Sequence, residues 1–275
     1  MWVFANEHFI YTLKDKQGNI VSAITDKARL KLENLRKSVD PELQAHTAVH
    51  EAGHAVLAAL TLRIVPATVV SRTASDAEGF CLVNFPKGPM TKESLKKDII
   101  ISLGGFVAER MIFGDAFTSS GVVNDVEEAS ALANKAIRKY AMGADPIHLA
   151  VENDNHEDAF YHSEKYAVEA IRIVKECERE AERILLRNKF LLLKMAEYLT
   201  VNSRMDEALI EEFVIKYGKE SWLKTTGLIK KEQYYQFNTV LRSQLQSLED
   251  EETDIAIEKL IAGVKTEKAV EGRVN

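Results

Sequence analysis

The first forty residues alternate short apolar runs with polar segments. Residues 9–13 and 20–24 are rich in strand-forming side chains and flank a polar segment at 15–19, which predicts a β-hairpin. A charged stretch over residues 26–39 follows and is typical of a surface helix. We therefore expect a hairpin and one helix over residues 1–40.

The next segment changes from a helical to a strand pattern. Asp40 can cap a helix, Pro41 fits its first turn, and Glu42 complements the helix dipole. The apolar spacing predicts that this helix runs over residues 41–60. Strand-like residues then surround a polar turn, which predicts a small sheet. The predicted strands are residues 66–71 and 80–85.

Helical spacing dominates the remainder of the chain. A helix is predicted over residues 91–113, capped by Thr91, and another over 124–142 after a Ser/Gly-rich loop at 118–121. From Ser163 the pattern is helical almost to the end. Breaks in it are predicted near residues 188, 202–203 and 218. The expected fold class is mainly α with a small β-sheet.

Composition narrows the class of protein. Hydrophobic residues make up 46% and charged residues 28% of the 275, as in ordinary folded proteins, which excludes an intrinsically disordered chain. Only 13 Gly and 5 Pro are present, which favours long helices over a loop-rich β design. The net charge is -6 and there is no long basic block, so nucleic acid is not an expected partner.

The cysteines and the apolar stretches bear on the expected compartment. Cys81 and Cys177 lie far apart and form no CxxC pair, so we expect reduced thiols. The most apolar stretch, residues 55–70, is interrupted by Arg63 and Pro66 and is too short to span a membrane. The N-terminal residues lack the order of a signal peptide. These observations predict a cytoplasmic protein without a membrane span.

The strongest chemical signal is an HExxH motif formed by His50, Glu51 and His54. Because the motif lies in a predicted helix, the two histidines share one face about a turn apart, where both can bind one Zn²⁺. Glu51 lies beside them and can take a proton from an activated water. A structural zinc site would normally be closed by four protein ligands, commonly including Cys, and neither cysteine has such spacing.

A third protein ligand must lie elsewhere in the chain. His46 is too far from His54 along a straight helix for one ion to bind it together with His50 and His54. Leu57 and Leu60 stand where the metzincin extension needs Gly and His. Spacing alone does not choose among the downstream carboxylates. These are Glu78, Glu93, Asp98, Glu109, Asp115, Asp125 and Glu128.

Several separate motifs, in order, resemble the peptidase domain of FtsH-type AAA zinc proteases. They are TAVHEAGHA at residues 47–55, LGGFVAERMIFG at 103–114 and TSSGVVND at 118–125. Residues 140–143 are similar to the Tyr-Gly-Met-Ser of that family, and the long helix from Ser163 resembles its C-terminal helices. The resemblance covers about residues 41–218.

The resemblance implies a role for each matched residue. His50, His54 and Asp125 correspond to the zinc ligands and Glu51 to the catalytic base. Glu109 resembles a residue that orients a ligand histidine through a hydrogen bond, without binding the metal itself.

A strand beside the metal is also implied, where an extended substrate would add through main-chain hydrogen bonds. Its expected substrate-binding residues are Gly79, Phe80, Cys81 and Leu82. Phe106 and Arg110 depart from the family pattern, so we expect altered packing or interface detail there. By resemblance a homo-oligomer, a hexamer, is expected.

The chain contains no GxxxxGK[ST] motif, and residues 217–220 do not fit one. We therefore expect a peptidase without its own ATPase, which works ATP-independently or with an ATPase partner in trans. The expected organisation is an N-terminal extension at 1–40, the peptidase domain at 41–218 and a helical extension at 219–275.

The main hypothesis is a zinc-dependent endopeptidase that hydrolyses unfolded or flexible polypeptides through a zinc-activated water, with Glu51 as general base. A non-catalytic zinc-binding adaptor is the alternative from another class, and retention of Glu51 argues against it because an adaptor needs no base. A regulatory peptidase that cuts one specific partner is a third hypothesis, which the sequence does not separate from the first.

Overall fold

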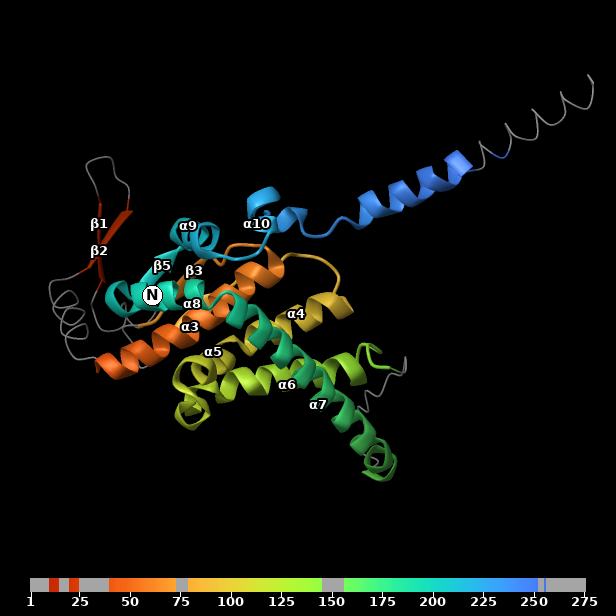
Figure 1. Cartoon of the computed structure of the whole chain (residues 1–275), viewed down its shortest axis with the longest axis horizontal. Helices are drawn as coiled ribbons and strands as arrows, with labels where there is room; N and C mark the ends of the chain where they lie inside the picture. The colour runs from red at the N-terminus through yellow and green to blue at the C-terminus, as the bar shows by residue number, and fades with distance from the viewer. Residues whose placement is uncertain are drawn as a thin grey trace, which may run out of the picture. The chain divides into compact units, whose positions relative to one another are not determined.

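The computed structural model of the protein describes residues 10–14, 20–24, 40–72, 79–144, 156–251 and 255. Helices make up most of this part of the chain, with short strands between them (Figure 1). The chain divides into two compact units, Met1–Lys231 and Glu232–Asn275. The predicted mainly helical class with a small sheet is confirmed.

The N-terminal strands form the predicted hairpin. β1 (Ile10–Lys14) and β2 (Ile20–Ile24) pair in a continuous antiparallel ladder. The predicted turn at 15–19 and the predicted helix at 26–39 lie outside the described residues.

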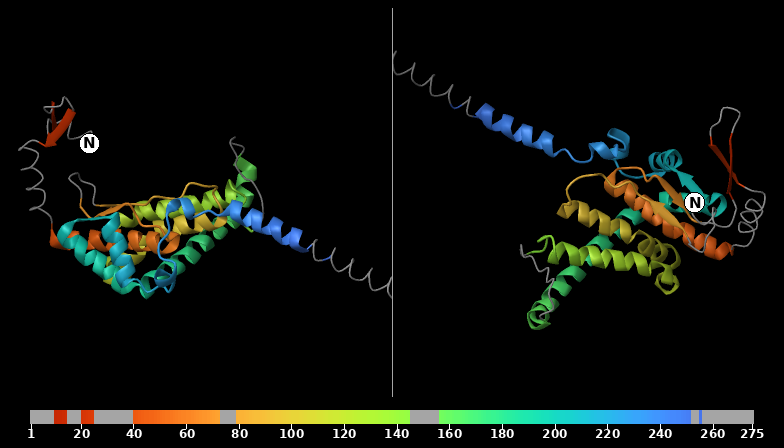
Figure 2. Two further views of the ribbon diagram at one scale, coloured as in Figure 1. Left: turned by 90° about the horizontal axis from the view of Figure 1, so that it is seen from above. Right: turned by 180° about the vertical axis from the view of Figure 1, so that it is seen from behind.

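Helix α3 (Pro41–Leu62) lies at the centre of the first unit (Figure 1). The other described α-helices of this unit are α4 (Lys92–Ser102), α5 (Gly104–Phe113), α6 (Val123–Arg138), α7 (His156–Arg187), α8 (Lys189–Asn202), α9 (Glu207–Tyr217) and α10 (Trp222–Thr225). Helices α4, α5, α7 and α8 pack against α3, chiefly α5 and α8, and α7 packs across α4, α5 and α6 (Figure 2).

Helix α3 begins where the residue types predict and ends at Leu62, two residues beyond the predicted end. The Asp40 side chain accepts the backbone N–H of Glu42 at 2.9 Å, and Pro41 occupies the first turn, where no N–H is needed. Arg63 ends the helix in the left-handed region, with φ at 61°. The middle of this helix carries small and aliphatic residues that are fully buried. They are Ala48, Ala52, Ala55, Val56, Leu57, Ala58 and Ala59.

A contact between two glycines brings α3 and α5 together. A Cβ atom on Gly53 would overlap the backbone oxygen of Gly104, and a Cβ atom on Gly104 would lie 2.8 Å from the His54 Cα. Larger residues at these two positions would force the helices apart, because the obstructing atoms belong mainly to the backbone, which cannot rotate out of the way as a side chain can. This approach places the HExxH face of α3 directly against α5.

The small sheet has three antiparallel strands. β3 (Thr68–Val70) lies between β4 (Phe80–Leu82) and β5 (Arg204–Asp206), with Val69 opposite both Cys81 and Met205. Among the described residues no strand pairs with the outer side of β4. Strand β5 was not predicted, and the two predicted strands are shorter than expected.

The helix boundaries correct two predictions and agree with a third. The single helix predicted over residues 91–113 is two helices, because Leu103 leaves the helical conformation, with ψ at 1°. The helix predicted over 124–142 ends earlier, at Arg138. From residue 156 the described chain is mostly helical, and its breaks fall at Asn188, Ser203 and Gly218, as predicted.

The second unit contains one helix in its described part, over residues 237–251. Its large apolar side chains are exposed, namely Phe237, Val240, Leu241, Leu245 and Leu248. None of the described helices in either unit is both long enough and apolar enough to cross a lipid bilayer.

Candidate metal centre

The two histidines of the HExxH motif converge in the middle of α3. His50 and His54 are four residues apart and therefore point the same way from the helix. Their Nε2 atoms lie 3.1 Å from each other. Both side chains are mostly buried, with 14% and 12% of their surfaces exposed.

Asp125 reaches the same point from the first turn of α6. Its Oδ2 atom lies 3.2 Å from His50 Nε2 and 3.1 Å from His54 Nε2. One donor atom from each of the three residues falls within 4.8 Å of the others, a spacing that fits a single metal ion. The structure thus brings together the two histidines and the carboxylate expected from the resemblance.

The outer nitrogens of both rings determine which atoms face the centre. His50 Nδ1 lies 2.7 Å from Glu109 Oε1, and His54 Nδ1 lies 2.8 Å from the Ile101 carbonyl oxygen. Because a carboxylate and a carbonyl accept hydrogen bonds, both Nδ1 atoms carry the proton and donate. Each Nε2 atom therefore faces the centre, and it can offer a lone pair to a metal ion there once it has given up its own proton.

The electrostatics of this centre favour a positive charge. Burial lowers the pKa of His50, but hydrogen bonds to Asp125 and Glu109 outweigh burial and raise that pKa to about 10. Burial raises the pKa of Asp125, but hydrogen bonds from both histidines outweigh it and place that pKa well below its usual range. Two imidazole nitrogens and one carboxylate oxygen are a donor set that Zn²⁺ accepts, so these residues fit a zinc ion.

Glu109 is a buried carboxylate whose oxygens are fully engaged. Besides His50 Nδ1, it accepts the backbone N–H of Ser119 at 2.8 Å and the Ser119 hydroxyl at 3.3 Å. Burial raises the pKa of Glu109, but the bonds from His50 and Ser119 outweigh it and lower that pKa. Glu109 therefore stays ionised and orients the His50 ring, and it is not itself part of the donor cluster formed by His50, His54 and Asp125.

Glu51 follows His50 on α3 and is 6% exposed. Burial raises its pKa, and the charges of His54 and His50 lower it in part. Gly79 lies against this carboxylate, since a Cβ atom there would be 2.8 Å from Glu51 Oε1. The end of β4 thus lies directly beside the predicted base.

Strand β4 carries the other predicted substrate-binding residues. Phe80 and Leu82 are exposed, at 44% and 51%, whereas Cys81 points inward and is half-buried. Burial, with the nearby Glu51 charge, raises the pKa of the Cys81 thiol, so it remains neutral. Gly79 therefore lies beside Glu51, and no described strand pairs with the outer edge of β4, but the role of Gly79 to Leu82 as a substrate site stays a prediction.

The other carboxylates left open by spacing do not join the cluster. Glu93, Asp98, Asp115 and Glu128 lie outside the only three-residue metal group among the described residues. Glu78 lies outside the described part of the chain. His46, excluded as a ligand from helix geometry, faces Glu109 at 3.6 Å.

Sequence reasoning missed Gly105. A Cβ atom at this position would overlap the imidazole ring of His50. Two consecutive glycines in the middle of an apolar helical segment, Gly104 and Gly105, are the signal that could have indicated a close approach to another element.

The two departures from the family pattern have a packing role. The Arg110 guanidinium lies 4.8 Å above the Phe106 ring, both on α5. The same guanidinium pairs with Glu178 and, at 3.9 Å, with Glu182 on α7. The ion pairs fasten α5 to α7, and the Phe106 ring packs against the same guanidinium.

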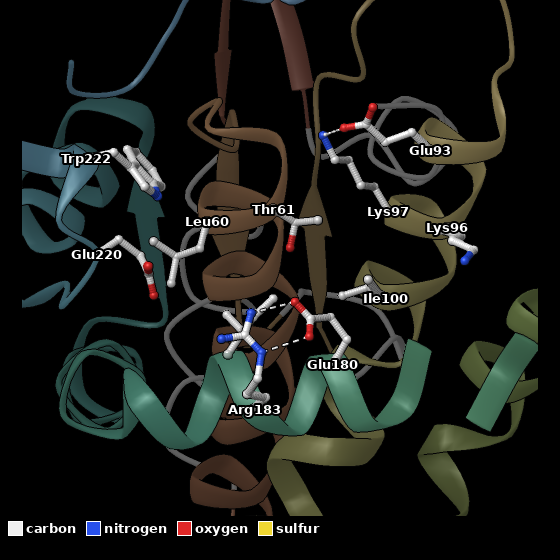
Figure 3. A pocket seen from close by; sticks show the side chains of 11 residues that line it. Leu60, Thr61, Glu93, Lys96, Lys97, Ile100, Glu180, Arg183, Glu220 and Trp222 are labelled. Carbon is white, nitrogen blue, oxygen red and sulfur yellow. Dashed lines mark hydrogen bonds and ion pairs between the residues drawn. The ribbon is translucent and has the colours of Figure 1, made fainter. Parts of the chain in front are cut away.

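A pocket of about 360 Å³ lies between α3, α4, α7 and α10 and shares no residue with the donor cluster (Figure 3). Its charged side chains largely neutralise one another. Lys97 pairs with Glu93 at 2.7 Å, and Arg183 pairs with Glu180 at 2.6 Å. None of the site residues implied by the family resemblance lines this pocket.

Comparison with known proteins agrees with the geometry. The chain is 31% identical over 186 residues to the mitochondrial inner membrane i-AAA protease supercomplex subunit YME1 of Saccharomyces cerevisiae, covering 66% of this chain and 24% of that protein. It is 29% identical over 253 residues to the ATP-dependent zinc metalloprotease FtsH of Neorickettsia risticii, covering 88% of this chain and 37% of that protein. The ATP-dependent zinc metalloprotease FtsH of Borreliella burgdorferi is 27% identical over 228 residues, covering 76% of this chain and 35% of that protein.

The chain thus spans between about a quarter and just over a third of the length of these relatives. Residues 37–213 match the family model described as Peptidase family M41. The predicted resemblance to an FtsH-type peptidase domain is confirmed, whereas the predicted domain boundaries stay predictions. Because the match covers more than half of the 275 residues and includes the whole donor cluster, the chain belongs to Peptidase family M41.

Proposed function

We propose that this chain is a zinc-dependent endopeptidase that hydrolyses unfolded or flexible polypeptides. The observation that carries the proposal is the convergence of His50, His54 and Asp125 within 4.8 Å, with Glu51 next to them on the same helix. Relatives named zinc metalloproteases support the choice of metal.

The three donors would hold the ion, and Glu109 and the Ile101 carbonyl would keep both imidazole rings in the required tautomer. When bound, Zn²⁺ supplies Lewis acidity, which polarises the scissile carbonyl and acidifies water. The chain's own contribution is to fix the donors before substrate arrives, because α3, α5 and α6 are packed elements and not mobile loops.

Glu51 would act as the general base. Its carboxylate takes a proton from the attacking water and then delivers a proton to the leaving amine, so the proton balance of peptide hydrolysis closes on one residue. Its neighbours are the ligand His50 and the strand end at Gly79, so the base lies between the metal donors and β4.

The outer edge of β4 would bind the substrate backbone. An extended peptide can pair with the outward N–H and C=O groups of this strand, which no other described strand binds, and main-chain pairing requires little sequence preference. The exposed side chains of Phe80 and Leu82 offer apolar contacts on this edge.

The test is cleavage of fluorescein-labelled casein by the full chain loaded with one zinc ion. Glu51→Gln should retain zinc and lose at least about 100-fold in rate, because a general base contributes at least this much. Glu42→Gln is the matched control, since Glu42 is an exposed glutamate on the same helix, and it should cut normally.

Equal activity of wild type and Glu51→Gln would contradict the proposed mechanism. A zinc-loaded wild type that cuts neither casein nor a peptide library would favour the zinc-binding adaptor instead.

Two finer proposals concern partners. The relatives are named ATP-dependent, so we infer that folded substrates need an ATPase partner, whereas unfolded casein is cut without ATP. We also infer a homo-oligomer, a hexamer by family resemblance. Cleavage of a folded substrate with and without ATP, and sedimentation of the full chain, test these proposals separately.

A further inference from the structure

His46 lies one helical turn before His50 on α3 and is 24% exposed. Its ring stacks on Phe113 of α5, with ring centres 4.9 Å apart and an angle of 12° between the planes. Its Nε2 atom lies 3.1 Å from the Phe117 carbonyl oxygen. Three contacts of a single side chain, counting Glu109, thus join α3, α5 and the segment that follows α5.

The chemistry of these contacts determines the tautomer of His46. The Phe117 carbonyl can only accept a hydrogen bond, so His46 Nε2 carries the proton and donates it. The same N–H faces Glu109 Oε2 at 3.6 Å. Glu109 therefore lies between two histidines, with His46 on one side and the ligand His50 on the other.

The segment between α5 and α6 is held at two points. His46 binds the carbonyl of Phe117 in the first short 3-10 turn, and Glu109 binds Ser119 just before the second. This connector, residues 114–122, leads directly into α6, whose first turn carries Asp125. The position of this connector therefore determines the position of the first turn of α6, and with it the position of the Asp125 carboxylate.

We infer that His46 is a positioning residue for the metal centre, which places the connector that delivers Asp125 and supports the carboxylate that orients His50. The inference rests on the proposed function, because it concerns the same zinc ion. His46 does not touch the ion, so its effect must pass through Phe117 and Glu109.

The experiment measures the zinc affinity of the full chain by competition with a chromophoric chelator. His46→Phe keeps a flat ring against Phe113 but loses the N–H donor, and it should bind zinc about tenfold more weakly. His46→Gln restores a donor and should recover most of the affinity. Leu43→Ala, an exposed position on the same helix, is the control and should bind like wild type.

A second readout separates positioning from general destabilisation. The visible spectrum of the Co²⁺-loaded protein reports ligand geometry, and it should change in His46→Phe but not in His46→Gln. Thermal unfolding of the variants shows which of them remain folded.

A folded His46→Phe that binds zinc as tightly as wild type, with the same Co²⁺ spectrum, would overturn this inference alone. Equal losses in His46→Gln and His46→Phe would also overturn it, because the donor would then not matter. A wild type that binds no zinc would overturn the proposed function and this inference with it.

Discussion

The backbone of Gly105 on α5 lies against the imidazole ring of His50 on α3, and a Cβ atom at Gly105 would overlap that ring. The ring is itself fixed by Glu109 at 2.7 Å and cannot turn aside without losing that bond. His50 can therefore take this position only if residue 105 has no side chain, that is, if it is glycine.

Gly105→Ala should displace His50 and lower zinc affinity at least about tenfold, with a loss of roughly 1–3 kcal/mol of stability from overpacking. Chelator competition and urea unfolding measure the two effects. Gly227→Ala is the matched control, because Gly227 has φ at 63° and open space around a Cβ atom. It should lose about 1 kcal/mol through backbone strain and keep its zinc affinity. Unchanged zinc affinity in Gly105→Ala would contradict the contact.

Glu109→Gln should weaken zinc binding by roughly 10–100-fold, since the amide removes the negative charge that orients and polarises His50. The measurement is again competition with a chelator, at constant pH. Glu93→Gln is the control, because Glu93 is 76% exposed on α4 and lies outside the donor cluster. Equal zinc affinity of the two variants would show that Glu109 does not support the ligand.

Gly79→Ala should reduce casein hydrolysis without changing zinc affinity. A Cβ atom at this position would lie 2.8 Å from Glu51 Oε1 and 2.7 Å from the Val70 carbonyl oxygen, so it disturbs the base and the end of β4 but none of the three donors. We expect a loss of about tenfold or more in kcat, which matches a displaced base. A variant that loses zinc instead would place Gly79 among the supports of the metal.

Local patterns predicted the half of the site that is local. His50, Glu51 and His54 lie within one helical turn and a half, so the 3.6-residue period alone brings them together. Asp125 is 71 residues beyond His54, and only the packing of α6 brings it near. Spacing left seven carboxylates open, and the family resemblance, not the helix period, singled out Asp125.

The errors in the fold prediction have the same origin. Strand β5 has three residues, and its pairing with β3 places Val69 opposite Met205, 136 residues later in the chain, which no local pattern shows. The break at Leu103 comes immediately before Gly104, whose backbone lies against the His54 backbone of α3, a contact between segments far apart in the sequence. Burial at long range, and not local propensity, decides both features.

Asp98 on α4 allows a pH prediction that is independent of the metal centre. Burial, with the charge of Glu128 on α6, raises the pKa of Asp98 to about 6. The folded protein therefore binds more protons than the unfolded chain between about pH 4 and pH 6, so this group makes the free energy of unfolding fall as pH rises through that window. Well above pH 6 Asp98 is ionised in both states, and the free energy of unfolding is lowered by the full amount that this group can contribute.

Asp98→Asn removes this cost and should be more stable than wild type at pH 7.5. The two pKa units would correspond to nearly 3 kcal/mol, but Asp98 is partly exposed and solvent screening reduces the gain to about 1 kcal/mol. Urea unfolding at pH 5.0 and pH 7.5 should show the gain growing with pH. In a Glu128→Gln background the gain should shrink, because part of the raised pKa comes from that charge. If Asp98→Asn stabilised the protein equally at both pH values, the raised pKa of Asp98 would be contradicted, because the asparagine would then act through packing and not through the removed charge.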